Sequence, residues 1–471
     1  MKSRRAVALL AFVLLLAAGV AAALYLTNRR DVTTSSDEAY QAYRQAIENE
    51  RRFYFKEAKV GFARALELDP DFAMALLGLA RQTEGDQGLS HVKRAARLKS
   101  RLSEREQLHV ALHLAGMEKG HEEAVRIARE IRKRFPEDVR AATIVANREV
   151  AEGNTERAIQ TFQQLLEIDP NIAEAYNLIG YYEAYRGNYG KAVEALKKYQ
   201  FMAPDQANPH DSLGEVQAYS GHYDEAIASL TKALEVKPDF FPSHEHLGVA
   251  YEGKGDYPRA IQHYRRAADL AIADGMRRFY LLRALRTALT SGDREAAAAL
   301  IAEVQRLPKD EYTDVRQVIL RAGGDLFNGR PAEAERLLEQ VKPDLYALFE
   351  KTLKPPRKAY DAGFTSLLAR AKAELGKDQE AIALYRVMIN PPNPWQGFEE
   401  RRWVYEGRAR LAALLAKAGD LDAAGKLLAE NRKWNPSWAP TRDAEQTVAR
   451  LLREKVLTAE GARGARPGTK K

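Results

Sequence analysis

The sequence predicts an all-α fold: a solenoid of repeated helix pairs that follows an N-terminal transmembrane helix. Three observations support this fold class. The 471 residues are rich in Ala, Leu, Glu, Arg and Lys, a composition typical of helices. Four residue columns recur every 34 residues, and a chain of this length forms one domain only when it grows by repetition. A run of 21 apolar or small residues without a charge stands near the N-terminus.

The apolar run Ala6–Leu26 is the first predicted element. At about 1.5 Å per residue it is long enough to cross the roughly 30 Å hydrocarbon core of a bilayer. Lys2, Arg4 and Arg5 precede it, so the positive-inside rule predicts a cytoplasmic N-terminus and a body on the far side.

A cleaved signal peptide is the alternative interpretation of this run. Ala21-Ala22-Ala23 satisfies the small-residue rule of a cleavage site. We favour an uncleaved anchor, because the run is long for a signal peptide and Tyr25 stands where an interfacial aromatic residue belongs. The predicted location is the cytoplasmic membrane, single-pass, with the body in the periplasm or extracytoplasmic space; cleavage would instead secrete the body.

The basic charge of the chain belongs to its two ends. Residues 1–30 carry five basic residues and no acidic one, and residues 453–471 carry six basic and two acidic ones. Since the formal net charge is +8, residues 31–452 are close to neutral, and no nucleic-acid partner is expected. The absence of cysteine excludes disulfides, thiolate metal sites and a cysteine nucleophile.

The 34-residue period holds in four columns of small or turn-forming residues. They are Pro136, Pro170, Pro204 and Pro238; Ala124, Ala158, Ala192, Ala226 and Ala260; Gly180, Gly214 and Gly248; and Gly153, Gly187, Gly221 and Gly255. A mid-helix glycine such as Gly180 costs about 1 kcal/mol against alanine, so it indicates close approach of the paired helix at Ala192. Aromatic residues at helical spacing, such as Phe162 and Tyr264, are predicted to pack in the core.

The turns between the helices follow from the same columns. Gly187-Asn188 and Gly255-Asp256 predict a left-handed glycine that ends one helix and an Asn or Asp that caps the next. Asp169-Pro170 ends the second helix of a pair, because the residue before proline is disfavoured in the α region.

These columns closely resemble the tetratricopeptide repeat (TPR), whose pattern has a small residue at position 8, Ala at 20, an aromatic or Leu at 24 and Pro at 32. The resemblance implies a right-handed superhelical solenoid of helix-turn-helix units. Matching units begin near residues 39, 105, 139, 173, 207 and 241, and segment 73–104 is a degenerate unit with a loop at Glu84–Leu89. Looser units are expected near 277, 315, 362 and 405, with Ala296, Ala334, Ala381 and Ala424 in the alanine column and proline-rich inserts at Leu353–Tyr360 and Asn390–Gly397.

The predicted domain organisation follows the regularity of the repeat. Residues 1–30 form the membrane anchor or signal segment, and 37–274 form a TPR array that is regular from 105. Residues 275–440 form divergent TPR-like repeats, and 441–471 form a capping helix near Asp443–Leu457 and a basic tail.

No catalytic residue, cofactor or metal site is predicted, so the chain is expected not to be an enzyme. His109 and His113 share a helix face but lack the Glu that follows the first His of a zinc-protease helix. His244 and His246 are too close in sequence to share a face. Ser212, next to Asp211 and near His210, has no nucleophile-elbow context and is expected to cap or line a helix.

The resemblance implies a binding groove lined by positions 2, 5, 9 and 12 of each unit's first helix. In the units at 173, 207 and 241 these positions include five acidic residues and no basic one. The predicted peptide-binding groove consists of Glu174, Asn177, Tyr181, Asn208, Asp211, Glu215, Glu245 and Glu252. The Lys/Asn/Arg clamp for a C-terminal carboxylate is missing, so we expect an extended segment with Lys or Arg, held through charge and through backbone contacts to Asn177 and Asn208.

The leading hypothesis is a non-enzymatic protein–protein interaction scaffold displayed outside the cytoplasmic membrane. Its expected partners are a protein or peptide, here a basic one, and the membrane itself. The stretch from Leu102 to Gly214 is also similar to the TPR regions of bacterial membrane-anchored proteins, some of which carry a kinase domain before the span. Only five residues precede the span here, so the alternative is a regulatory or sensor partner of a separate membrane kinase or receptor.

Overall fold

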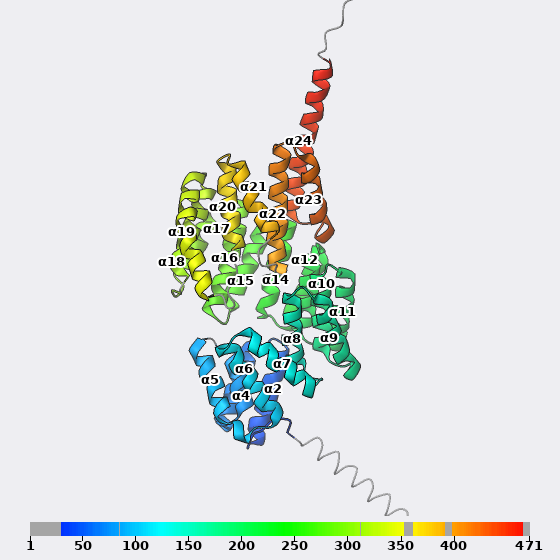
Figure 1. The fold of residues 1–471 in the computed structure, drawn as a ribbon, viewed down its shortest axis with the longest axis vertical. Helices are drawn as coiled ribbons and strands as arrows, with labels where there is room; N and C mark the ends of the chain where they lie inside the picture. Colours follow the sequence, from blue (N-terminus) through cyan, green and yellow to red (C-terminus); the bar gives the residue numbers. More distant parts are fainter. Residues whose placement is uncertain (1–29, 84, 311, 353–360, 391–397, 465–471) are drawn as a thin grey trace, which may run out of the picture. The chain divides into compact units, whose positions relative to one another are not determined.

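The computed structural model describes residues 30–83, 85–310, 312–352, 361–390 and 398–464. Throughout these ranges the regular elements are helices, and none is a strand, which confirms the all-α prediction. The helices form two compact units, the first ending at Phe135 and the second beginning at Pro136 (Figure 1). The predicted span Ala6–Leu26 lies outside the described residues, and no described helix is long and apolar enough to cross a bilayer.

The first unit consists of helix hairpins that bury an aromatic centre. Its elements are α2 (Asp37–Arg51), α3 (Phe55–Leu68), α4 (Ala73–Arg81), α5 (Gly85–Arg97), the 3₁₀ turn η1 (Lys99–Arg101), α6 (Glu104–Glu118) and α7 (His121–Arg134). Phe62 is fully buried, and Tyr43 packs against both Phe62 and Phe72 with ring centroids 6.0 and 4.9 Å apart. Ser103 and Glu106 form a capping box at the start of α6, which satisfies amide groups that the helix leaves unpaired.

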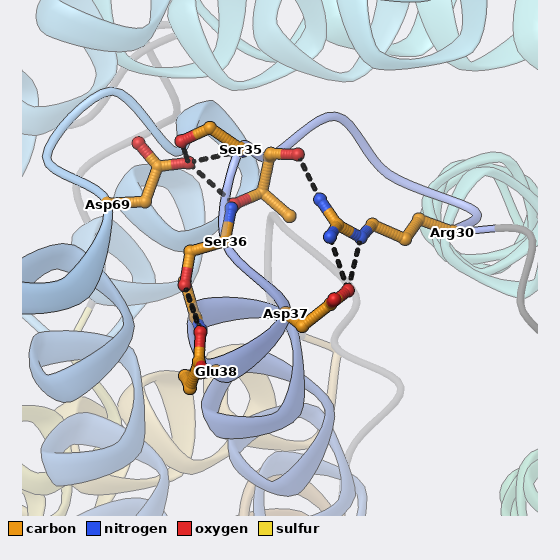
Figure 2. Close-up of polar contacts among 8 residues, drawn as sticks. Arg30, Ser35, Ser36, Asp37, Glu38 and Asp69 are labelled. Atoms are coloured by element: carbon orange, nitrogen blue, oxygen red, sulfur yellow. Dashed lines mark hydrogen bonds and ion pairs between the residues drawn. The ribbon is translucent and has the colours of Figure 1, made fainter.

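The segment that precedes α2 is fastened to the first unit by two buried carboxylates. Asp69 accepts hydrogen bonds from the Thr34 hydroxyl at 2.5 Å and from the Ser35 amide at 2.9 Å, and Figure 2 shows this contact beside the Arg30–Asp37 pair. Glu106 accepts from the amide and hydroxyl of Thr33, both at 2.7 Å. Although burial by itself raises the pKa of Asp69, these hydrogen bonds lower it below its ordinary value.

The second unit continues the hairpins without interruption by any other kind of element in its described residues. Its helices are α8 (Val139–Ala151), α9 (Thr155–Ile168), α10 (Ala173–Tyr185), α11 (Tyr189–Met202), α12 (Ala207–Tyr219), α13 (Tyr223–Val236), α14 (Phe241–Lys254), α15 (Tyr257–Leu270), α16 (Asp274–Ser291), α17 (Arg294–Gln305), α18 (Thr313–Phe327), α19 (Pro331–Thr352), α20 (Ala362–Glu374), α21 (Asp378–Ile389), α22 (Phe398–Lys417), α23 (Leu421–Trp434) and α24 (Ala439–Gly464). Apart from α17 and α18, consecutive helices of this unit pack on each other, as expected of a solenoid.

The physical reasons given for the repeat columns are confirmed. A Cβ on Gly180 would lie 2.6 Å from Leu196 Cγ, so the paired helices do meet at this glycine. Gly187 and Gly255 adopt φ of +80° and +87°, the left-handed conformation predicted for the turns. Asp169, which precedes a proline, leaves the helix for an extended conformation at φ −141°.

Three local predictions are wrong. The loop expected at Glu84–Leu89 is instead the start of α5 from Gly85 onward, because Val92 and Ala95 of that helix are fully buried and packing outweighs the low helix propensity of glycine. Asn188 stands at the N-cap position of α11, but its side chain does not cap the helix, because the side-chain Nδ2 donates to Glu183 Oε2 at 2.7 Å. In the unit near 277 the buried alanine of the second helix is Ala297, one residue after the predicted position.

The divergent C-terminal repeats begin close to the predicted positions, at α16, α18, α20 and α22. The last helix, α24, runs from Ala439 to Gly464 and is longer than predicted, and its Ala444 and Val448 bury against α22 and α23. Both proline-rich inserts, 353–360 and 391–397, lie outside the described residues. The right-handed superhelical twist implied by the family resemblance stays a prediction.

Candidate protein-binding groove

The predicted groove residues stand on the first helices of three consecutive hairpins in the second unit. They are Glu174, Asn177 and Tyr181 on α10; Asn208, Asp211 and Glu215 on α12; and Glu245 and Glu252 on α14. Helices α10 and α12 contact each other directly, as do α12 and α14. The predicted residues therefore stand on neighbouring first helices, as the 34-residue period implies.

Hydrogen bonds join the three helices along this face. The Tyr181 hydroxyl on α10 donates to Glu215 Oε2 on α12 at 2.6 Å. Asp211 on α12 accepts from the Ser243 hydroxyl of α14 at 2.7 Å and from His246 Nδ1 at 3.0 Å. Five polar side chains thus form one continuous network across α10, α12 and α14.

The network carries a buried imidazolium at His246. Its Nδ1 faces Asp211, and its Nε2 lies 3.5 Å from Glu215 Oε1, so both ring nitrogens point at carboxylates. Burial by itself lowers the pKa of His246, but the charges of Asp211 and Glu215 raise it to about 10. Burial raises the pKa of the Glu215 carboxyl, and the neighbouring His246 opposes this. His246 is consequently a fixed positive charge at neutral pH.

Helix α16 supplies two further cations to the same face. Arg283 pairs with Glu245 and is only 5 % exposed in its side chain. Arg286 lies 3.2 and 3.3 Å from the two carboxylate oxygens of Glu252, and the Tyr264 hydroxyl donates to Glu252 Oε2 at 3.0 Å. The acidic groove expected from the sequence is therefore largely neutralised from within the chain.

These cations were missed because the family pattern was applied to only three units. Arg283 and Arg286 lie in the next unit, 34 residues after Val249 and Glu252 and therefore at positions 9 and 12 of the same pattern, and His246 follows Glu245 directly. The available signal was charge: α16 contains four arginines within Arg277–Arg286, opposite the acids of α14. A search for complementary charge one repeat further along would have found them.

The two groove asparagines, Asn177 and Asn208, differ in their hydrogen bonding within the chain. Asn208 is 5 % exposed and donates to the Tyr199 hydroxyl at 3.0 Å, so it is engaged within the chain. Asn177 is 7 % exposed, and no hydrogen-bond donor among the described residues reaches its Oδ1. A buried amide oxygen without a donor is costly, so the hydrogen-bonding requirement of this groove atom is not met within the described residues.

The other chemical constellations considered from the sequence do not assemble. His113 Nδ1 bonds to the backbone oxygen of His109 at 2.8 Å, so the two rings do not converge on an ion. His210 is held by Gln200 and by the Pro204 carbonyl rather than by Ser212. In the described part of the chain, no group of three or more His, Cys, Asp or Glu side chains is arranged to hold a metal.

Comparison with known proteins identifies the repeat in the central part of the chain. The tetratricopeptide-repeat family model matches residues 111–171, 145–207 and 212–275. No curated protein matches the chain significantly.

Several solved structures align with the chain at low sequence identity and with TM-scores below 0.5. The crystal structure of the APC/C hetero-tetramer Cut9–Hcn1 aligns at a TM-score of 0.47 and 17 % identity, over 94 % of this chain and 82 % of that chain. Human IFIT1, as a dimer with m7Gppp-AAAA, aligns at 0.42 and 16 % identity, over 75 % and 90 %. MamA aligns at 0.28 and 24 % identity, over 33 % and 91 %. Residues 111–275 of this chain are tetratricopeptide repeats, within a described fold that is an all-helical, TPR-like solenoid.

Proposed function

We propose that the chain is a protein-interaction scaffold that binds an extended protein segment along α10, α12 and α14. TPR hairpins stack their first helices side by side, and such solenoids use that surface to bind other proteins. The network from Tyr181 through Glu215 to His246 supports this assignment, because it holds the side chains of three repeats in one rigid arrangement. A preorganised surface loses little freedom on binding, which favours affinity.

Asn177 is the observation that carries the proposal. Its buried Oδ1 has no donor among the described residues, while the other groove asparagine, Asn208, already has a partner in Tyr199. An extended segment offers a backbone N–H at every residue except proline, and one of these would satisfy Asn177. Backbone contacts of this kind hold a segment without dictating its sequence.

A basic partner remains part of the proposal, in a narrower form than the sequence indicated. Glu215, Glu245 and Glu252 already face cations of the chain, so a Lys or Arg side chain would have to share them with His246, Arg283 or Arg286. Charge is therefore expected to tune the partner's orientation and association rate more than its affinity.

We further propose that residues 6–26 anchor the chain in the cytoplasmic membrane with its body on the extracytoplasmic side. The support is the sequence: an uncharged apolar run of membrane-spanning length, preceded by Lys2, Arg4 and Arg5. Extraction of cell membranes with carbonate separates the two alternatives. An anchored chain stays in the membrane with residues 1–26 intact, whereas signal cleavage releases a chain that starts after Ala23.

Site-specific photo-cross-linking tests the groove. A benzoylphenylalanine at Tyr181 probes the network, and one at Phe201, which is 86 % exposed at the end of α11, is an aromatic control in the same hairpin. We expect a discrete cross-linked protein at Tyr181 that is absent at Phe201. The product should disappear in Asn177→Leu, which keeps the volume but removes the acceptor, and persist in Asn171→Leu in the exposed turn before α10. Equal products at both probe positions, or a product indifferent to Asn177, would refute the assignment.

A further inference from the structure

Trp434 and Asn435, at the start of the connection between α23 and α24 (the C-terminal joint), pack against turns that lie more than two hundred residues earlier in the chain. Asn435 is 3 % exposed, and its side-chain amide donates to the backbone oxygen of Tyr219 at 3.1 Å. Its Oδ1 accepts from the Tyr223 hydroxyl at 3.2 Å. Tyr219 and Tyr223 flank the turn between α12 and α13, so one asparagine side chain clamps that turn from outside.

The neighbouring Trp434 makes the same kind of contact one repeat earlier. Its ring stands edge-on to Tyr189 at the start of α11, with centroids 6.4 Å apart and planes at 88°. The contact requires the turn glycine: a Cβ on Gly187 would lie 2.5 Å from Trp434 Cζ3. In the next turn, a Cβ on Gly221 would lie 2.6 Å from Asn435 Oδ1. These two turns therefore fit the C-terminal joint closely.

Turn glycines elsewhere in the array show that this fit is specific. Gly153 and Gly255 occupy the same place in their repeats and have the same φ, +87°, as Gly221. A Cβ on either would meet nothing within 4 Å. Left-handed backbone explains glycine at all these turns, but only Gly187 and Gly221 also make room for another part of the chain.

A second contact connects the C-terminal repeat with the proposed groove. The Arg286 guanidinium, which pairs with the groove residue Glu252, lies 5.1 Å from the ring centroid of Trp403 on α22. Helix α24 contacts α14, the helix that carries Glu252. The C-terminal repeat thus reaches both the turn edge of α10–α13 and the last of the groove side chains.

We propose that the C-terminal repeat α22–α24 is an intramolecular clasp, which docks on the turns at Gly187 and Gly221 and restricts access to the groove. The contacts described between this repeat and the turns and Arg286 include two neutral hydrogen bonds, ring contacts and one cation–π pair, each weak alone. The clasp can therefore detach while the hairpins remain folded on their neighbours. A protein that binds only the open form has its apparent affinity reduced by the closed population, and in turn holds the clasp open. The regulatory part of this inference rests on the proposed scaffold function.

Matched glycine variants test the docking itself without any ligand. Gly221→Ala adds a methyl group against Asn435, whereas Gly255→Ala adds the same methyl at the same φ where nothing lies within 4 Å. Because the natural chain has no cysteine, spin labels can be placed at Lys191→Cys on α11 and Lys433→Cys on α23. Electron–electron distance measurements should give one short distance in the parent and in Gly255→Ala, and a majority of longer distances in Gly221→Ala. Identical distance distributions in the two glycine variants would overturn the clasp.

Asn435→Ala provides a second variant that removes both hydrogen bonds and introduces no clash. It should also lengthen the label distance, and it should increase the yield of the Tyr181 photo-cross-link several-fold. A longer distance with an unchanged yield would overturn the regulatory role. If no protein cross-links at Tyr181 in any variant, the scaffold proposal fails, whereas the distances still decide whether the clasp exists.

Discussion

Because folding raises the pKa of His246, we predict that the second unit loses stability in mildly alkaline solution. The ring is 12 % exposed in its side chain and lies between Asp211 and Glu215. Its pKa of about 10 in the fold exceeds the ordinary value of 6.5, since the two carboxylates outweigh the opposing effect of burial. A histidine whose pKa is raised by folding stabilises the fold fully below pH 6.5, and this contribution is lost as the pH rises through about 10.

The expected size of the effect follows from proton linkage. Between the two pKa values the folded state holds one proton more than the unfolded state, so each pH unit removes up to about 1.4 kcal/mol. From pH 6.5 to 8.5 the free energy of unfolding should fall by about 2–3 kcal/mol. His244, whose pKa is lowered to about 4, and His263, whose pKa is also lowered, reduce this fall by up to about 1 kcal/mol, because their unfolded rings are half protonated at pH 6.5 and lose that proton by pH 8.5.

Tryptophan fluorescence gives the required readout, because all four tryptophans follow residue 390 and so belong to the second unit. Urea unfolding at pH 6.5 and 8.5 should show the loss in the parent chain. His246→Gln should be less stable at pH 6.5, since it leaves two carboxylates without their cation, and should have a much smaller pH dependence. His244→Gln, two residues away on α14, should keep the parental dependence. An unchanged pH dependence in His246→Gln would refute the charge assignment.

Three further predictions concern the repeat, the N-terminal segment and a buried lysine. Gly180→Ala should destabilise the second unit by about 1–2 kcal/mol through overpacking. Gly425→Ala, where a Cβ meets nothing within 4 Å, should instead stabilise it by about 0.5–1 kcal/mol. Urea unfolding measures both, and a change of the same sign in the two free energies of unfolding would contradict the packing argument. Asp69→Ala should speed hydrogen exchange in the segment before α2 and leave α6 protected, and unchanged exchange would show that the carboxylate does not fasten the segment. Lys372→Met should lower the free energy of unfolding by roughly 1–3 kcal/mol in the same assay, because the 9 % exposed Lys372 side chain has its ammonium within 3.2 Å of three glutamates. The exposed Lys426→Met should lower it by less than about 0.5 kcal/mol. Similar losses in the two variants would contradict the burial argument.

Much of the hairpin geometry was readable from the sequence, because it depends on residues close together in the chain. Gly180 marks the meeting of α10 and α11, and Asp169-Pro170 marks the end of α9. Local reasoning was wrong where packing competes with propensity. At α5 the buried Val92 and Ala95 keep glycine-containing residues helical, and at Asn188 the side chain turns back to Glu183 rather than to the next helix.

The candidate groove was predictable in its residues but not in its electrostatics. The 34-residue period places Asp211 and Glu215 on the same face as Tyr181, and the structure joins them as expected. The three mapped units end before Arg283 and Arg286, so their acidic residues were counted without the cations of the next unit. The net charge along one unit therefore overstated the acidity of the surface.

The sequence alone determined the repeat, its turns and the face that the first helices share, because a 34-residue period encodes contacts between neighbouring hairpins. Only the tertiary structure showed that Asn435 meets Tyr219 and Tyr223, which are 216 and 212 residues away. That contact depends on the accumulated rotation of every hairpin in between, a quantity that small changes in each repeat alter and that no local pattern records.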